Sequence, residues 1–257
     1  MTSVRRIMGI LLILTLFGLW PVSRYGVLPL DIAGTALATE YLKGQGDAEI
    51  SEEAGITVPD PWEPFNRKMF TLNDRLYFYV LKPVATVYKG WIPEGVRTAV
   101  DNAFDNIAFP VRFINNTFQG KLEGAGIETG RFLINSTMGL GGLFDIAGRN
   151  FDLKARNEDF GQTLGYHGMK PTIYMVWPVF GPSSLRDTIG LGADAASNPL
   201  FWLSPGYAES AGIWAGEHMN DTSLVIGEYE DFKKSAIDPY VAMRDAYLNY
   251  RENQVKK

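Results

Sequence analysis

Apolar residues recur at helical spacing along much of the chain after residue 60. In the first such segment, residues 61–83, they follow one another every three or four positions: Phe65, Met69, Leu72, Leu76 and Tyr79. Three more aromatic residues lie on the opposite side of the same helix: Phe70, Tyr77 and Phe78. A helix that is apolar over most of its circumference suits burial or contact with lipid better than a water-facing surface.

Helical patterns continue through most of the remaining sequence. Between residues 93 and 110 the apolar and charged positions separate onto the two faces of an amphipathic helix. Residues 121–136 predict a further helix. Its small residues form pairs four positions apart that would let a neighbouring helix approach closely: Gly120, Gly124, Gly126 and Gly130.

Capping residues mark the starts of two later helices. Ser184 with Asp187 makes a capping box, and Asp238 followed by Pro239 opens the last helix of the chain. Glycines and prolines break every periodic run in residues 157–182. No segment after residue 20 holds the roughly 18 uninterrupted apolar residues of a spanning helix. The pattern therefore predicts an all-α fold whose amphipathic helices can lie within one membrane leaflet.

The first 58 residues differ from the rest in composition. Arg5 and Arg6 precede an apolar run over residues 7–20, which is typical of a signal peptide. Residues 36–38 offer a small-residue cleavage site, and a retained N-terminal anchor is the alternative. We therefore divide the chain into a signal peptide or anchor (1–38), an acidic flexible tether (39–58) and a helical domain (59–257).

Charge and residue usage exclude several classes of function. With 24 basic and 29 acidic residues, a formal net charge of −5 and no basic stripe, the chain is not expected to bind nucleic acid. It has no cysteine, which excludes disulfides, thiolate metal sites and acylation of a lipoprotein cysteine. The two histidines, His167 and His218, lie far from one another and from any carboxylate cluster, so we expect no metal site.

One group of residues has the composition of a serine-hydrolase triad. Ser183 or Ser184 would have to meet His167 and Asp187, but residues 181–183 lack the second glycine of a nucleophile elbow. The capping role explains Ser184 and Asp187 without catalysis. We therefore expect no catalytic residue and no cofactor.

Two surface features leave alternatives open. The first is an aromatic group made of Phe201, Trp202, Tyr207 and Trp214. It is equally consistent with a membrane-interface belt and with packing in the core. The second is a face of the last helix that suits a lipid phosphate, a partner's carboxylate or plain solvation, and it carries Tyr240, Arg244, Tyr247 and Arg251.

Six ordered blocks of sequence resemble the MlaA/VacJ family over nearly all of residues 60–252. The blocks are 60–67 with Phe70, Asn73 and Asp74; 115–121; 131–132 with 135–139 and 142–145; 158–165; 181–183 with 186–187; and 238–240 with Arg244, Tyr247 and Arg251. The resemblance implies a ring of amphipathic helices around a central amphipathic channel, embedded in the inner leaflet of the outer membrane.

The resemblance also implies partners and a direction of work. Phospholipid mislocalised to the outer leaflet would enter the channel and pass to a soluble periplasmic carrier, MlaC in the family. A porin trimer would hold the ring, and an inner-membrane ABC transporter would complete the pathway. This chain departs from the family in having no cysteine to acylate. We therefore expect it on the periplasmic side of the outer membrane, held by its apolar face, by porin or by an uncleaved N-terminus.

We expect two sets of functional residues. For the channel and the lipid headgroup we expect Asp187 and Asp194, on one helical face, with Arg186 as the phosphate partner. For gating we expect a glycine-rich turn and a polar pair on the first helix: Gly139, Gly141, Gly142 and Phe144, with Asn73 and Asp74. Two other functions stay open, namely a structural porin-associated envelope or virulence factor and a periplasmic hydrolase.

Overall fold

The computed structural model describes residues 58–203 and 206–257, and helices make up most of them. The elements follow in the order α3 (Glu63–Leu76), the π-helix η1 (Tyr77–Leu81), α4 (Lys82–Trp91), α5 (Glu94–Ile107), α6 (Phe109–Phe118), α7 (Leu122–Thr137), α8 (Ile146–Phe151), α9 (Phe160–Tyr166), β1 (Tyr174–Trp177), β2 (Gly181–Ser184), α10 (Leu185–Ser197), α11 (Pro199–Leu203), α12 (Tyr207–Leu224), α13 (Glu228–Ser235) and α14 (Pro239–Lys256). The predicted mostly helical fold is confirmed.

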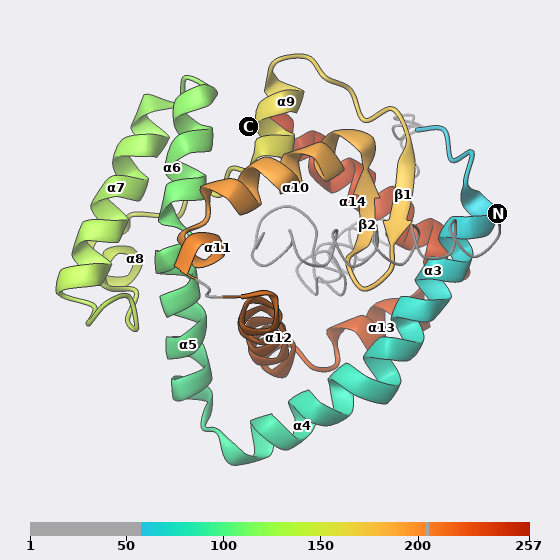
Figure 1. Cartoon of the computed structure of the whole chain (residues 1–257), viewed down its shortest axis with the longest axis horizontal. Helices are drawn as coiled ribbons and strands as arrows, with labels where there is room; N and C mark the ends of the chain where they lie inside the picture. Colours follow the sequence, from blue (N-terminus) through green and yellow to red (C-terminus); the bar gives the residue numbers. More distant parts are fainter. Residues whose placement is uncertain (1–57, 204–205) are drawn as a thin grey trace.

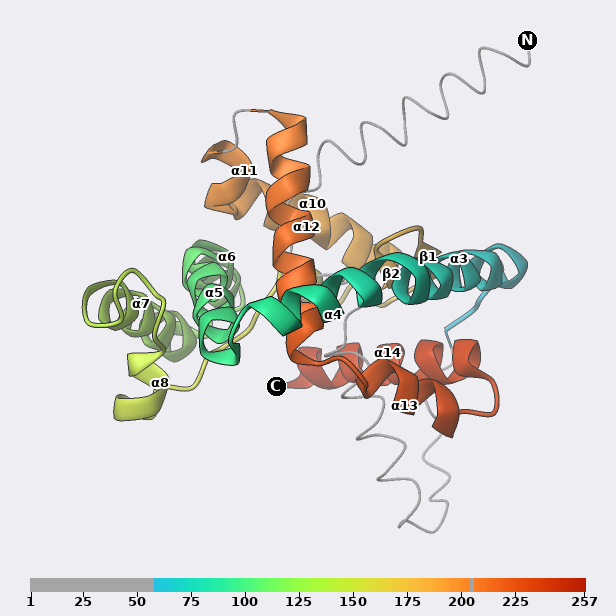
Figure 2. The same ribbon diagram turned by 90° about the horizontal axis from the view of Figure 1, so that it is seen from below.

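The ribbons are arranged as a ring. In Figure 1, α3, α4, α5, α6, α10 and the β1–β2 hairpin follow one another around it, and α12 lies inside and packs on α4 and α5. Seen from below, α11 and the first turns of α12 stand on one side of the ring, with α13 and α14 on the other (Figure 2). No helix in the described part is both long and apolar enough to cross a membrane.

The first helix is longer than its sequence predicts. α3, η1 and α4 form one continuous rod to Trp91, whereas the apolar pattern predicts an end at Pro83. Pro83 lies in the first turn of α4 after the π-helical segment. Proline is tolerated in a first turn, so the rod continues through it.

α6 and α7 approach each other closely at one of the predicted glycines. A Cβ atom on Gly124 would lie 2.0 Å from Oδ1 of Asn116. The rings of Phe109 and Phe132 stack across the same pair of helices with their centroids 4.5 Å apart. Gly126 has open space around it, so the close approach is confirmed at Gly124 and does not extend to every glycine of the pattern.

A β-hairpin occupies the segment in which the sequence shows no periodic run. β1 and β2 pair antiparallel, with Tyr174 opposite Ser184 and Trp177 opposite Gly181. The turn between them places Val179 at a φ of 69°, a left-handed conformation that non-glycine residues rarely adopt. The hairpin is the exception to the predicted all-α fold among the described residues.

The interior is unusually polar. The apolar core consists of small clusters, and the two larger ones centre on Tyr77 with Phe232 and on Tyr174 with Tyr240. Among the described residues, buried polar and charged side chains outnumber buried apolar ones. Val58, the first described residue, is already buried against the second cluster. Residues 1–57, with the predicted signal peptide and nearly all of the predicted tether, lie outside the described part.

Candidate functional site

A buried ion network lies where α9, α10 and α14 meet. Asp187, at the start of α10, is 1% exposed. Its carboxylate accepts hydrogen bonds from Arg251 Nη2 at 2.7 Å, Arg186 Nε at 3.0 Å, Tyr247 Oη at 2.7 Å and Ser184 Oγ at 2.7 Å. Ser184 is also the N-cap of α10, because its side chain accepts from the Asp187 backbone N–H. The capping role predicted for Ser184 is confirmed.

Opposite charges hold Asp187 in its ionised form. Burial raises the pKa of the Asp187 carboxyl, but the charges of Arg251 and Arg186 outweigh it and hold that pKa well below its usual range. Arg251 also donates to Asp159, with 2.8 Å between Nη2 and Oδ1. Burial lowers the pKa of Arg251, and the two carboxylates raise it above the ordinary value by more. The network is therefore a compensated set of charges inside the protein.

Asp194 lies on the same helix in a different electrostatic environment. Its Oδ1 accepts from Asn115 Nδ2 at 2.9 Å and from the Phe160 backbone N–H at 3.0 Å. Burial and the nearby charge of Asp159 raise its pKa well above the usual range for a carboxyl. Asp194 therefore connects α10 to α6 and α9, in a site where burial and the charge of Asp159 act against its charged form.

The three residues predicted to meet a lipid headgroup are thus enclosed by protein. Arg186, Asp187 and Asp194 are each 1% exposed, and each bonds to residues of the chain itself. The arrangement makes them connectors between helices. Direct contact of any of them with a headgroup stays a prediction.

A second polar network supports the outer helices α5, α6 and α7. Arg112 pairs with the buried Glu128 across α6 and α7. Arg131 Nη2 lies 3.3 Å from Oδ1 of Asp145, which caps α8, and Asn135 Nδ2 donates to the same oxygen at 2.9 Å. Asn135 and Asp145 lie on either side of the glycine-rich turn in the sequence, so the bond between them joins the two segments that flank the turn.

That turn is held in a left-handed conformation that glycine alone adopts without strain. φ is 54° at Leu140, 75° at Gly141 and 97° at Gly142. A Cβ on Gly142 would lie 2.4 Å from Cβ of Asn106, and one on Gly139 would lie 2.3 Å from the Phe144 carbonyl oxygen. The tip of the turn exposes apolar side chains: Met138, Leu140, Leu143 and Phe144. A gating role for the turn stays a prediction.

Asn73 and Asp74 belong to α3, which lies across the ring from α7 and α8, the helices that flank that turn (Figure 1). Asn73 Nδ2 donates to the Trp177 carbonyl at 2.9 Å, and its Oδ1 accepts from the Val179 N–H at 2.7 Å. Asp74 Oδ1 accepts from Tyr229 Oη at 3.0 Å and from Lys233 Nζ at 2.7 Å. The structure therefore does not bring the two predicted gating elements together.

A second asparagine makes the same kind of clamp as Asn73. Asn66 Nδ2 donates to the Tyr174 carbonyl at 3.2 Å, and its Oδ1 accepts from the Val176 N–H at 2.9 Å. Because Asn66 and Asn73 lie two turns apart on α3, they bind the backbone of the hairpin at two successive points. Sequence reasoning missed this role, although both residues lie in the first family-like block.

Many large apolar side chains are exposed to solvent. They occur on the rod, on the tip of the glycine-rich turn, on the surface of α6 and α7 and on α11, and include Leu72, Tyr79, Val80, Val84, Val87, Trp91, Phe113, Phe118, Leu122, Leu133 and Trp202. Trp91 is 82% and Trp202 72% exposed. Exposed apolar surface beyond scattered residues marks a site of contact with lipid or protein.

The structure describes both surface features for which the sequence leaves alternatives open, the aromatic group near Trp202 and the face of the last helix. Of the aromatic group, Trp202 is exposed, whereas Trp214 packs against Phe180 with ring centroids 5.5 Å apart. On the last helix, Arg251 and Tyr247 are bound to the chain's own carboxylates, so that part of the face is neither solvated nor open to a partner. Asp238 and Pro239 begin α14 as predicted.

The hydrolase set is not assembled. Ser183 Oγ is bonded to the Ser184 carbonyl and to Thr188 Oγ1, at 3.2 and 3.0 Å. The exposed His167 has its Nε2 3.0 Å from the Phe118 carbonyl oxygen. Asp187 is committed to the ion network, so none of the three side chains bonds to another in the described part. No group of three or more His, Cys, Asp and Glu that could hold a metal occurs among the described residues.

Exposed apolar helix faces around an interior of paired charges define a helical protein built to contact apolar partners. The chain matches the MlaA lipoprotein family over residues 58–254 and belongs to that family. It is 30% identical over 222 residues to the intermembrane phospholipid transport system lipoprotein MlaA of Escherichia coli K12, with 85% of this chain and 86% of that protein covered. It is 35% identical to an uncharacterised protein of Rickettsia conorii over 80% of this chain and 82% of the relative.

A solved structure shows the same fold. It is described as the structural basis for maintenance of bacterial outer membrane lipid asymmetry. The TM-score is 0.68 and the sequence identity 32%, over 77% of this chain and 99% of the solved chain. The resemblance read from the six blocks is thus confirmed.

Proposed function

We propose that this protein removes mislocalised phospholipid from the outer leaflet of the outer membrane through its helical ring and passes it to a periplasmic carrier. One observation carries the proposal: many large apolar side chains of the ring helices are exposed, whereas most buried side chains are charged or hydrogen-bonded polar ones. The MlaA relatives, named as parts of an intermembrane phospholipid transport system, support the same substrate.

The proposed mechanism is a conduit and involves no enzyme chemistry. A lipid path needs an apolar wall for the acyl chains and polar groups for the headgroup, and it needs no nucleophile or cofactor. The buried networks around Asp187 and Arg112 fix the helices against one another, so the wall keeps its shape without the networks touching lipid. The apolar tip from Met138 to Phe144 is the element that we propose to gate the path.

The proposed location is the periplasmic side of the outer membrane. Since the sequence holds no cysteine, we propose that the exposed apolar residues of α4 and α11 bind the leaflet, with a porin trimer beside them. A soluble carrier of the MlaC kind would receive the lipid, and an inner-membrane ABC transporter would complete the pathway.

The test is rescue of a deletion strain in which surface-exposed phospholipid is measured by an exogenous palmitoyl-transfer reporter. Val87 is 62% exposed on α4, so Val87→Glu places a charge on the apolar face, and Val87→Leu is the matched control. We expect wild type, Val87→Leu, Ser183→Ala and His167→Ala to restore a low signal and Val87→Glu to fail at equal protein level. Asp187→Trp is not informative here, because the ring would disrupt the buried ion network.

Two outcomes separate the rival functions. Loss of rescue by Ser183→Ala in a folded protein would make the protein a hydrolase. Purified wild type that carries no phospholipid, together with full rescue by Val87→Glu, would leave a structural porin-associated factor as the better account.

A further inference from the structure

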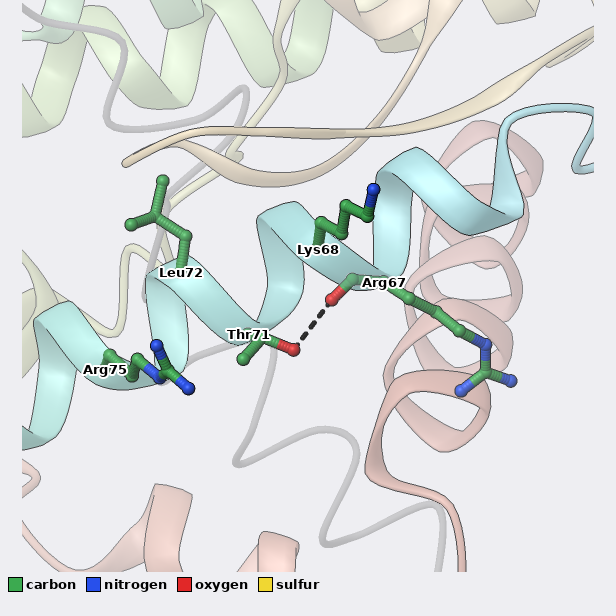
Figure 3. A pocket seen from close by; sticks show the side chains of 5 residues that line it. All are labelled: Arg67, Lys68, Thr71, Leu72 and Arg75. Atoms are coloured by element: carbon green, nitrogen blue, oxygen red, sulfur yellow. Dashed lines mark hydrogen bonds between the residues drawn. The ribbon is translucent and has the colours of Figure 1, made fainter.

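A basic hollow lies on α3, apart from the buried networks. It measures about 380 Å³ and is lined by Arg67, Lys68, Thr71, Leu72 and Arg75. Figure 3 shows these five side chains projecting from consecutive turns of the helix. The hollow thus holds three cations and one apolar side chain, together with the Thr71 hydroxyl, which donates to the Arg67 carbonyl at 2.8 Å.

The three cations are not equivalent. Arg67 is engaged, with Nε 2.7 Å from Glu63 Oε1 and Nη2 2.9 Å from Asp238 Oδ2. Lys68 and Arg75 are exposed and form no hydrogen bond or ion pair in the described part of the chain. Lys68 and Arg75 lie two turns apart on one face of the helix, and two long cationic side chains with no carboxylate of their own are suited to an anion that both can reach.

The face that carries these cations continues into an apolar one. It advances by four, three and four positions through Lys68, Leu72 and Arg75 of α3 to Tyr79 of η1. The π-helical segment adds one residue to the turn, so the next residue on the same face is five positions on. The face therefore continues through Val84, Val87 and Trp91, all of which are exposed.

The length of the apolar part fits one acyl chain. From Tyr79 to Trp91 the helix rises about 18 Å at roughly 1.5 Å per residue. One leaflet of a bilayer has a hydrocarbon thickness of about 15 Å, half of about 30 Å. A phosphate at the basic end and an acyl chain along the apolar end would match a single phospholipid.

We propose that this face, defined by Lys68, Leu72, Arg75, Tyr79, Val84, Val87 and Trp91, binds one glycerophospholipid. Lys68 and Arg75 hold its phosphate, and the residues from Tyr79 onward contact an acyl chain. The proposal rests on the proposed function and adds a lipid site outside the ion networks of the ring.

The experiment uses the full chain in detergent with a phospholipid that carries a photoreactive group on its headgroup. Crosslinked peptides are mapped by mass spectrometry. We expect a crosslink within residues 67–75 that falls about tenfold in the Lys68→Ala/Arg75→Ala variant, equivalent to about 1.4 kcal/mol. Lys89→Ala removes an exposed cation of α4 that does not line the hollow, and it should leave the crosslink unchanged. Circular dichroism checks that each variant is folded.

Three arms decide the identity of the ligand. A diacylglycerol with the same photoreactive group should not crosslink there, and millimolar inorganic phosphate should not displace the phospholipid. An undiminished crosslink in the folded double variant, or displacement by free phosphate, overturns the proposal. So does a double variant that keeps the crosslink but no longer binds the periplasmic carrier, because the cations would then serve a protein. Wild type that takes up no phospholipid anywhere would instead overturn the proposed function.

Discussion

Asp187 and Asp194 are equally buried carboxylates on α10, but neutralising them should lower the stability of the folded protein by different amounts. Asp187→Asn removes the negative charge that pairs with Arg186 and with Arg251. Arg251 also pairs with Asp159. Breaking a buried ion pair costs about 3–5 kcal/mol, and because Arg251 keeps Asp159 we expect about 3 kcal/mol. For a domain of this size that lowers the melting temperature by about 6–12 °C. Asp194→Asn should cost less than Asp187→Asn, since burial and the nearby charge of Asp159 raise the pKa of Asp194 and disfavour its charged form.

The dependence on pH separates the two effects further. The folded-state pKa of Asp187 is lowered, so its stabilisation is present above the unfolded pKa of about 4 and is lost as the pH falls below it. The deficit of Asp187→Asn relative to wild type should therefore be nearly constant from pH 4 to 8 and shrink only at lower pH. The folded-state pKa of Asp194 is raised, so its contribution is present below about pH 4 and is lost as the pH rises through the folded pKa. Asp194→Asn should accordingly compare best with wild type at pH 8.

The assay is thermal unfolding of the purified protein in one detergent, followed by circular dichroism at pH 4, 6, 7 and 8. Wild type and both variants are measured side by side, so the detergent contributes equally to each. An Asp187→Asn protein that melts within about 2 °C of wild type at pH 7 would refute the reasoning. An Asp194→Asn protein that loses as much as Asp187→Asn would do the same.

Three further predictions concern the turn, the hairpin and the location. Gly142→Ala should lower the stability by about 2 kcal/mol or more and Gly141→Ala by about 1 kcal/mol, as measured by thermal unfolding. Both positions have a positive φ, but only a Cβ at Gly142 would also clash with a neighbouring side chain. Equal losses of stability would contradict this reasoning. Asn73→Ala removes two hydrogen bonds to the hairpin and should lower the stability by about 1–3 kcal/mol. Hydrogen exchange at the Val179 amide should become faster, and unchanged exchange would show that these bonds are dispensable. The mature chain should fractionate with the outer membrane, and recovery in the soluble periplasm without detergent would count against its apolar faces as the anchor.

Local signals in the sequence predicted the helices well. Ser184 and Asp238 cap the helices that they were expected to cap, because capping is a contact between residues two or three positions apart. The same local reasoning failed at Pro83, where a π-helical segment lets the helix continue. The hairpin was missed because its β1 strand is bound by Asn66 and Asn73, more than 100 residues earlier in the chain.

The roles of the charged residues were harder to predict than their importance. Asp187 and Arg251 both fall in family-like blocks, so the sequence marked them. It did not show that they bind each other, because their pairing spans 64 positions and depends on how α10 and α14 pack. A charge next to lipid and a charge that fixes two helices look alike in sequence. Burial distinguishes the two kinds of charge, and the buried Asp187 is one that fixes two helices against each other.

The bonds between the two ends of the domain impose an order on its folding. Tyr240 donates to Asp60 across 180 positions, and Arg67 pairs with Asp238. Closing a loop of that length costs about 5 kcal/mol of chain entropy before any contact is made. If the chain is exported as proposed, the closure cannot form until α14 has left the secretion machinery, and the chain stays open until its last residues emerge. A chain that ends before residue 238 would lack the bonds of Asp238 and Tyr240 that join the two ends of the domain. Its apolar helices would then be exposed in the periplasm, the proposed location, and other proteins would have to bind or degrade it.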